Sequence, residues 1–190
     1  MKCLKMDWFK NTRKKILSLR HSSEAVAAVE FALILPVLMM LYMGSIEVSQ
    51  VISVDRKMAV ATGALGDLVA QSDEQLDEDV LDDFFEAVGL ILTPFPADNL
   101  KQLVTLVFVD EDGDTEVVWS VGYNGAVAKE VDSTYTLPAE IIAIASETYV
   151  VVAETQLEYE PWGGYVLPGN FNLYKQFFHL PRFGVEIELV

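Results

Sequence analysis

The chain has a single cysteine, Cys3, among its 190 residues. A lone cysteine has no partner within the chain, so no intramolecular disulfide can support the fold. Histidine is almost as scarce, since His21 and His179 are the only two. A structural zinc site is usually built from four cysteine and histidine ligands, and this composition excludes such a site.

Basic residues become rare beyond residue 24. Residues 1–24 hold seven lysines and arginines against two acidic residues, a net charge of +5. Residues 25–190 hold six against 27, a net charge of −21. Because phosphate binding needs clustered lysine and arginine, we expect no nucleic-acid partner. A basic flank before a single membrane span predicts a cytoplasmic N-terminus and an exported, periplasmic C-terminal part.

One long apolar run, AVAAVEFALILPVLMMLYMGSI, occupies residues 25–46. A helix needs about 20 apolar residues to cross the hydrocarbon core of a bilayer. We therefore predict a basic cytoplasmic leader at 1–25, a transmembrane helix at 26–47 and a periplasmic domain at 48–190. The alternative is a cleaved signal peptide, but its basic segment would be unusually long and no small-x-small cleavage site follows the run closely.

The helical pattern continues beyond the apolar run without a proline to interrupt it. Six apolar residues recur at steps of three and four, the spacing of one helix face: Val51, Val54, Met58, Ala61, Leu65 and Leu68. We predict one helix from about Ser23 to about Gln71. Its first half would lie in lipid and its second half would pack on the domain.

A second helix is predicted to begin at a capping box formed by Ser72 and Gln75. Four apolar residues recur at helical spacing along it, namely Leu76, Val80, Phe84 and Val88. Residues 73–86 also hold eight carboxylates. They form either a cation-binding patch or a solvated face whose acids favour the helix N-terminus; the second interpretation requires no ligand, and we adopt it.

From Leu103 onward the apolar pattern is typical of strands. Strands are predicted at 103–110, 115–121, 149–160 and 185–190, with long loops at 122–140 and 161–182. Asp112-Gly113 marks a hairpin turn between the first two strands. In the third strand, alternate residues share one face: Val151, Ala153, Thr155, Leu157 and Tyr159. The predicted fold class is α+β, a long transmembrane helix continuing into a domain with a second helix and a roughly four-stranded antiparallel sheet covered by helix on one face.

Few residues suggest catalysis or metal binding. Asp110, Asp112 and Asp114 resemble a calcium loop, but an EF-type loop needs glycine at position six and glutamate at position twelve, and the hairpin explains these residues without metal. His179 has no recognisable nucleophile motif to act with, and no glycine-rich turn joins a strand to a helix. We therefore expect a protein that is not an enzyme, with no catalytic residue, no cofactor and no metal.

The predicted loop at 161–182 is rich in aromatic residues and poor in charge. Trp162, Tyr165, Phe177 and Phe178 form either a flap over the open face of the sheet or a partner-binding surface, since exposed aromatic residues are common at interfaces. The sequence leaves both interpretations open.

The apolar run also carries a motif. Val26-Ala27-Ala28-Val29 precede Glu30-Phe31-Ala32-Leu33, Pro36 follows, and the run ends in Gly44-Ser45-Ile46-Glu47. This segment resembles the N-terminus of the TadE-like pseudopilins of tight-adherence (Flp-type) pilus systems. Those proteins typically show a glycine, four small or apolar residues, Glu-Phe-Ala-Leu, and a span that ends in Gly-x-x-Glu. The family usually has glycine at the position of Ala25.

The resemblance implies that a membrane prepilin peptidase cuts between Ala25 and Val26, which makes Glu30 the fifth residue of the mature chain. It further implies that Glu30 and Phe31 serve assembly with other pilin or pseudopilin subunits and the pilus machinery, at the bacterial inner membrane. A carboxylate inside a membrane span costs several kcal/mol unless it is paired, and the new terminal amine is a partner for it. The alternative functions are a single-span anchored periplasmic binding or secretion-accessory domain and, less well supported, an anchored enzyme.

Overall fold

The computed structural model describes residues 23–190. Its elements, in chain order, are α2 (Ser23–Ala70), β1 (Gln75–Leu76), α3 (Glu78–Ile91), β2 (Lys101–Val109), β3 (Thr115–Tyr123), α4 (Ala139–Ile144), β4 (Thr148–Tyr159), β5 (Phe171–His179) and β6 (Glu188–Leu189). The fold is α+β, as predicted: α2 and α3 lie against a four-stranded antiparallel sheet.

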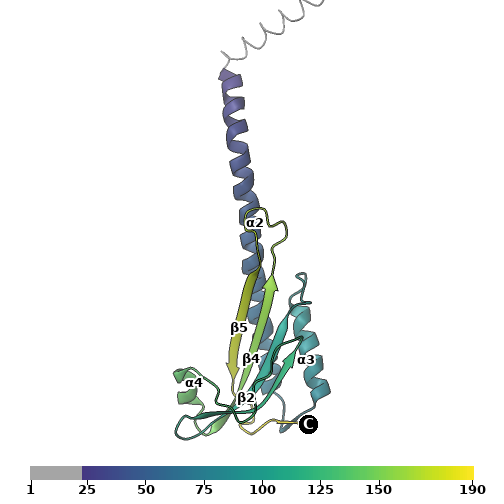
Figure 1. The fold of residues 1–190 in the computed structure, drawn as a ribbon, viewed down its shortest axis with the longest axis vertical. Coiled ribbons are helices and arrows are strands. Elements are labelled where there is room, and N and C mark those ends of the chain that lie inside the picture. The colour runs from purple at the N-terminus through teal and green to yellow at the C-terminus, as the bar shows by residue number, and fades with distance from the viewer. Residues whose placement is uncertain (1–22) are drawn as a thin grey trace, which may run out of the picture.

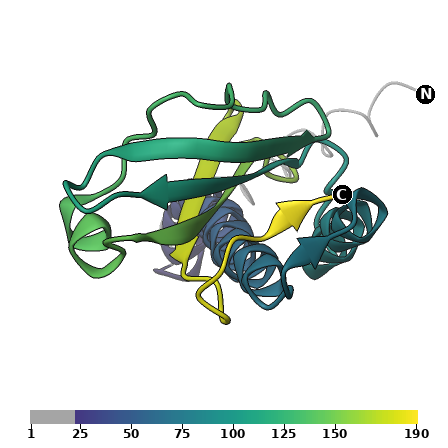
Figure 2. The ribbon, with the colours of Figure 1, turned by 90° about the horizontal axis from the view of Figure 1, so that it is seen from below.

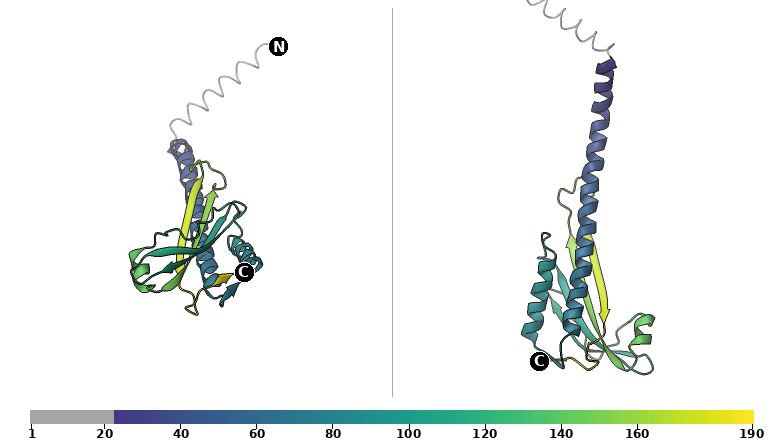
Figure 3. Two further views of the ribbon diagram at one scale, coloured as in Figure 1. Left: turned by 60° about the horizontal axis from the view of Figure 1, so that its bottom comes forward. Right: turned by 180° about the vertical axis from the view of Figure 1, so that it is seen from behind.

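The long helix α2 has two different halves. Its N-terminal half projects away from the rest of the chain, and its C-terminal half lies along the sheet (Figures 1 and 3). The predicted helix face is buried there, since Val54, Met58, Ala61 and Leu65 are each fully covered. The helix ends at Ala70, one residue before the predicted end.

The sheet has the strand order β3-β2-β4-β5, and every neighbouring pair is antiparallel. The hairpin between β2 and β3 is closed by the predicted turn. There the Asp110 carboxylate accepts hydrogen bonds from the backbone N–H groups of Asp112 and Asp114, at 2.9 and 2.8 Å. Gly113 has a φ of 86°, a left-handed conformation that glycine adopts without strain. The Asp110 carboxylate is therefore used by the turn itself.

Both faces of the sheet are partly covered. On one face the predicted row of β4, from Val151 to Tyr159, is buried against α2 and α3. On the other face a smaller cluster forms where Tyr135, Leu137 and Ala145 pack on Val107, Val109, Val117, Val150 and Val152. Figure 2 shows the helices on one side of the sheet and the connection from β3 to α4 passing on the other. The central strands β2 and β4 are therefore largely apolar throughout.

The prediction for the second helix was wrong in its start, and only part of its predicted apolar face is buried. Residues Gln75 and Leu76 form β1, and α3 begins only after Asp77, whose carboxylate accepts a hydrogen bond from the N–H of Asp79 at 2.8 Å. The buried side chains are Leu81, Phe85 and Val88, whereas Val80 is 41 % exposed. All eight carboxylates of residues 73–86 are exposed, as a solvated face requires.

Two strand predictions also need correction. The fourth strand of the sheet is β5, which lies inside the predicted loop at 161–182, and not the segment 185–190. In that last segment only Glu188 and Leu189 pair, and they pair parallel with β1. The terminal segment is held by the buried side chain of Ile187 and by a hydrogen bond from the indole N–H of Trp119 to the Ile187 carbonyl, at 2.7 Å. It closes the space between the sheet and the start of α3.

Candidate functional site at the junction of span and domain

Among the described residues, α2 is the one helix that is long and apolar enough to cross a membrane, and its apolar part is the projecting half. Its large side chains are open to the surroundings: Phe31 is 59 %, Leu33 72 %, Leu41 67 % and Tyr42 69 % exposed. Pro36 lies within this half without ending the helix. Apolar side chains exposed all around a helix are expected in lipid and unfavourable in water. The chain is therefore consistent with a single-pass membrane protein.

Glu30 lies on this span, exposed like its neighbours. Within residues 23–190 the structure shows neither a hydrogen bond nor an ion pair for its carboxylate. The predicted partner of Glu30, an amine at the end of the chain or on another subunit, is not part of the described fold. Ala25 and Val26, the predicted processing site, lie near the start of α2, and residues 1–22 of the predicted leader lie outside the described residues.

A second carboxylate on α2, that of Glu47, is in the opposite situation. Its side chain is only 2 % exposed because the connection between β4 and β5 lies over it. Glu47 Oε1 accepts a hydrogen bond from the N–H of Tyr165 at 2.8 Å, and Oε2 accepts one from the N–H of Leu167 at 2.7 Å. The N–H of Val166 lies between the two oxygens, at 3.4 and 3.2 Å. Three consecutive amides thus satisfy one buried carboxylate.

The helix turns on either side of Glu47 complete this contact. One turn further along, the Gln50 side-chain oxygen accepts hydrogen bonds from the N–H of Trp162, at 3.0 Å, and from the hydroxyl of Tyr159, at 3.4 Å. One turn earlier, a Cβ placed on Gly44 would come within 3.2 Å of the Val166 side chain. The spacing of three places all of them on one helix face.

Glu47 and Gln50 were not among the predicted site residues. The available signal was the Gly-x-x-Glu ending of the apolar run, which places a carboxylate at the boundary of the span and a glycine one turn before it. Only the fold shows what that carboxylate binds.

The structure separates the four aromatic residues predicted as a partner surface. Trp162 and Tyr165 lie in the connection beside α2 and are 77 % and 72 % exposed. Phe177 and Phe178 lie in β5, where Phe177 is paired with Ala153 on the helix side of the sheet and Phe178 packs on the cluster of the opposite face. They do not share one continuous face with Trp162 and Tyr165.

His179 lies at the end of β5 against α2. A Cβ placed on Gly66 would overlap its imidazole ring. The Nε2 atom is buried and has no hydrogen-bond partner among the described residues. Burial lowers the pKa of His179, and the negative charge of Asp67 opposes this effect. His179 is therefore held as a neutral packing residue.

The opposite face of the sheet carries a polar network centred on Glu154. Its two carboxylate oxygens accept hydrogen bonds from the hydroxyls of Tyr135, at 2.6 Å, and Tyr174, at 2.7 Å. The Gln176 amide donates to the Tyr135 hydroxyl at 2.8 Å. Burial and the nearby Glu154 carboxylate raise the pKa of both tyrosines. The tyrosines remain neutral donors, and the network ties β4 and β5 to the connection that precedes α4.

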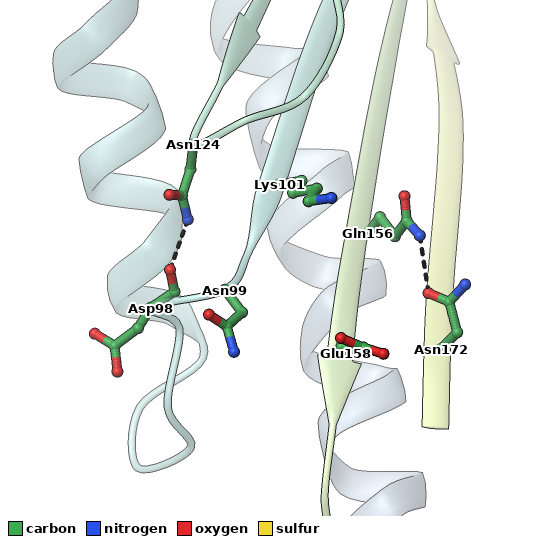
Figure 4. A pocket seen from close by; sticks show the side chains of 7 residues that line it. All are labelled: Asp98, Asn99, Lys101, Asn124, Gln156, Glu158 and Asn172. Carbon is green, nitrogen blue, oxygen red and sulfur yellow. Dashed lines mark hydrogen bonds between the residues drawn. The ribbon is translucent and has the colours of Figure 1, made fainter. Parts of the chain in front are cut away.

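A polar hollow of about 390 Å³ lies on the same face, near the start of β2 (Figure 4). It is lined by Asp98, Asn99, Lys101, Asn124, Gln156, Glu158 and Asn172. Several of these groups satisfy one another or the backbone: the Asn124 amide donates to the Asp98 carbonyl at 2.7 Å, and the Gln156 amide donates to the Asn172 side-chain oxygen at 3.0 Å. The lining contains no histidine, cysteine or serine that could act as a nucleophile or base in the usual constellations.

No arrangement of three or more histidine, cysteine, aspartate or glutamate side chains suited to a metal ion occurs in the part of the chain that the structure describes. Along α2, the contact with the most hydrogen bonds is the binding of three backbone amides by Glu47. The Glu47 carboxylate and these amides are hydrogen-bonded to one another, so the contact fixes the position of the loop on the helix.

Comparison with protein families gives one match. Residues 25–64 match the model of the TadE-like protein family, which confirms the resemblance predicted from the apolar motif. The match covers most of α2, including Glu30, Gly44 and Glu47. Neither the curated proteins nor the solved structures that were compared contain a significant match.

Proposed function

We propose, from the TadE-like character of residues 25–64, that this chain is a pseudopilin-like, membrane-anchored protein that serves assembly of a tight-adherence pilus. The family match suggests involvement in that assembly, and α2 supplies the membrane anchor. The proposed location is the bacterial inner membrane, with the N-terminus in the cytoplasm. The excess of positive charge before the span supports this orientation, because basic flanks are retained on the cytoplasmic side.

The observation that carries the proposal is the exposed carboxylate of Glu30 on a lipid-facing helix. An unpaired carboxylate in lipid is unfavourable by several kcal/mol, so an exposed one calls for a partner from another group. If the chain is cut before Val26, the new amine lies one helical turn from Glu30, about 6 Å along the axis. The carboxylate can then pair with its own amine or with that of a neighbouring helix.

Pairing between neighbouring helices would set the register of packed subunits. Head-to-tail contacts that do not close into a ring generate helical filaments. The proposed partners are pilin or pseudopilin subunits, the assembly machinery and a prepilin peptidase. The proposed role is non-enzymatic, since it requires binding and positioning only.

Replacement of Glu30 tests the proposal. Glu30→Leu is expected to insert at least as well as the parent chain, because it removes a charge from lipid, and to abolish surface pili, because the amine loses its partner. Glu30→Asp is expected to be intermediate, because its shorter side chain reaches less far. Membrane abundance and surface pili are measured side by side for each variant.

Glu24→Leu is the matched control. It removes a carboxylate from the same helix on the leader side of the predicted cut, so it should leave piliation unchanged. A Glu30→Leu chain that is abundant and fully piliated would remove the main support for a pseudopilin-like role. It would favour a single-span anchored domain with a binding or secretion-accessory role.

A further inference from the structure

The connection between β4 and β5 has an unusual surface. We call residues 161–170, PWGGYVLPGN, the junction loop; none of them is charged, although residues 25–190 together carry a net charge of −21. Its large side chains nevertheless point outward, with Trp162 77 %, Tyr165 72 % and Val166 40 % exposed. Exposed aromatic residues that gain nothing from packing within the domain call for an external contact.

The junction loop is attached to α2 at one position along the helix axis. Glu47 binds its N–H groups at residues 165–167, and Gln50 binds the N–H of Trp162. The loop accordingly lies beside α2 at the point where the helix leaves the domain (Figures 1 and 3). Its backbone cannot move along the helix without breaking these bonds and exposing the Glu47 carboxylate.

This position along α2 coincides with the end of the predicted membrane span. A helix rises about 1.5 Å per residue, so the twenty residues from Val26 to Ser45 span about 30 Å, the thickness of a hydrocarbon core. Glu47 and Gln50 then fall at the boundary between hydrocarbon and headgroups. The three amides that cover the Glu47 carboxylate also explain how a charge is tolerated there.

Tryptophan and tyrosine are the residues that this boundary favours, because each has an apolar ring and a polar group. Tyr42, 69 % exposed, lies just before it on α2 itself. Trp162 and Tyr165 add two aromatic side chains at nearly the same level. An uncharged loop also avoids the repulsion that an acidic surface meets at anionic headgroups.

We propose that the junction loop lies on the membrane surface, with Trp162 and Tyr165 in the headgroup region of the periplasmic leaflet. The domain is then attached at two points, the span and the loop, and Glu47 holds them together. This arrangement sets the orientation of the sheet relative to the membrane. The proposal rests on α2 spanning the bilayer and is independent of any role in pili.

Tryptophan fluorescence tests it. The chain has three tryptophans, Trp8, Trp119 and Trp162, and Trp119 is buried in the domain. The full chain with Trp8→Phe is reconstituted in phosphatidylcholine vesicles, with or without phosphatidylcholine brominated near the top of its acyl chains. The difference between this chain and Trp8→Phe/Trp162→Phe isolates the emission of Trp162. We expect brominated lipid to quench most of it, while aqueous iodide quenches little and Trp119 responds to neither.

Two variants of Glu47 make the test specific. Glu47→Ala should free the loop, so that lipid quenching of Trp162 falls and iodide quenching rises. Glu47→Gln, which keeps one carbonyl acceptor, should show a smaller change. The emission of Trp119 reports whether each variant keeps its fold, and resistance to carbonate extraction reports independently that α2 is inserted.

Two results with the Trp8→Phe chain, whose Glu47 is intact, would overturn the proposal. Quenching of Trp162 by iodide and not by brominated lipid would place the loop in water, as a surface available to a protein partner. Protection from both quenchers would mean that protein covers the loop.

Discussion

Two glutamates on α2, Glu30 and Glu47, differ in exposure and in hydrogen bonding although they lie on the same helix. Glu30 is exposed and without a partner in the described fold, whereas the Glu47 carboxylate is covered and accepts hydrogen bonds from three backbone amides. Hydrogen bonds to a charged group contribute about 1.5–3 kcal/mol each. Glu47 therefore acts inside the chain, whereas the proposed role of Glu30 requires a partner from outside the described residues.

His179 provides a prediction at the residue scale. Burial lowers its pKa, so the unfolded chain binds the proton more tightly than the folded chain does. The corresponding contribution to stability is fully present above the unfolded pKa of about 6.5 and is lost as the pH falls from there through the lowered pKa of the folded chain. The melting temperature of the full chain in detergent should therefore drop between neutral pH and about pH 5, before most carboxylates titrate.

His179→Gln removes the titrating group and should flatten this part of the pH profile. An equally steep loss in the variant would show that other groups cause it.

At the scale of elements, α2 is both an anchor and the main support of the sheet. Its inner face meets β4 through a buried hydrogen bond between the hydroxyls of Thr62 and Thr155, at 2.6 Å. It reaches α3 through Lys57, whose ammonium group donates to the carbonyls of Ile91 and Thr93 at 3.1 and 2.7 Å. It reaches β5 through an ion pair of Asp55 with Lys175. The sheet and α3 are thus both attached to the same helix.

The two glycines in the packed half of α2 should respond oppositely to alanine. A Cβ on Gly63 would meet nothing within 4 Å, whereas a Cβ on Gly66 would overlap the His179 ring and lie 3.3 Å from the Ala153 Cβ. Gly63→Ala should stabilise the domain by about 0.5–1 kcal/mol through helix propensity alone. Gly66→Ala should destabilise it by about 1–3 kcal/mol, because the buried His179 ring, which the new methyl group would overlap, must leave its packed position.

Thermal melting in detergent, followed by near-ultraviolet circular dichroism, measures both variants. Equal stabilisation by the two substitutions would show that the contact at Gly66 is loose.

At the scale of the whole molecule, the domain is attached to one helix, whose other half projects away from it (Figure 1). The exposed large side chains of that half are apolar apart from Glu30. The C-terminus lies at the end of the domain remote from that half (Figure 1). Processing at the N-terminus would therefore change the membrane end of the molecule and leave the domain intact.

Cleavage between Ala25 and Val26 is the prediction at this scale. The intact mass of protein from its native membrane should fall by the mass of residues 1–25 when the prepilin peptidase is present, and not in a strain that lacks it. Ala25→Gly, which restores the residue usual in the family, should increase the cleaved fraction. A full-length mass in both strains would exclude cleavage and leave the membrane anchor unaffected.

Features that depend on local pattern could be predicted from the sequence. The apolar run determines a helix long enough to cross a membrane, because in the bilayer core every backbone N–H and C=O group must form its hydrogen bond within the segment. The steps of three and four from Val51 to Leu68 determine the packed face of α2, and the alternation from Val151 to Tyr159 determines the buried face of β4. Asp112-Gly113 indicates the hairpin, because Gly113 adopts without strain the left-handed conformation that the five-residue connection 110–114 requires there.

Features that depend on contacts between distant segments were decided only by the tertiary structure. Segment 171–179 lacks a clear alternation, and it becomes a strand because the edge of β4 offers it nine paired positions. Gln75 and Leu76 leave the predicted helix because Glu188 and Leu189 pair with them, which moves the cap to Asp77. Glu47 acquires its role in the same way: the apolar run places a carboxylate at the end of the span, and only the return of the chain at residues 165–167 supplies the amides that bind it. The backbone N–H group is the same in every residue except proline, so the sequence alone does not show which carboxylate a given N–H group will bind.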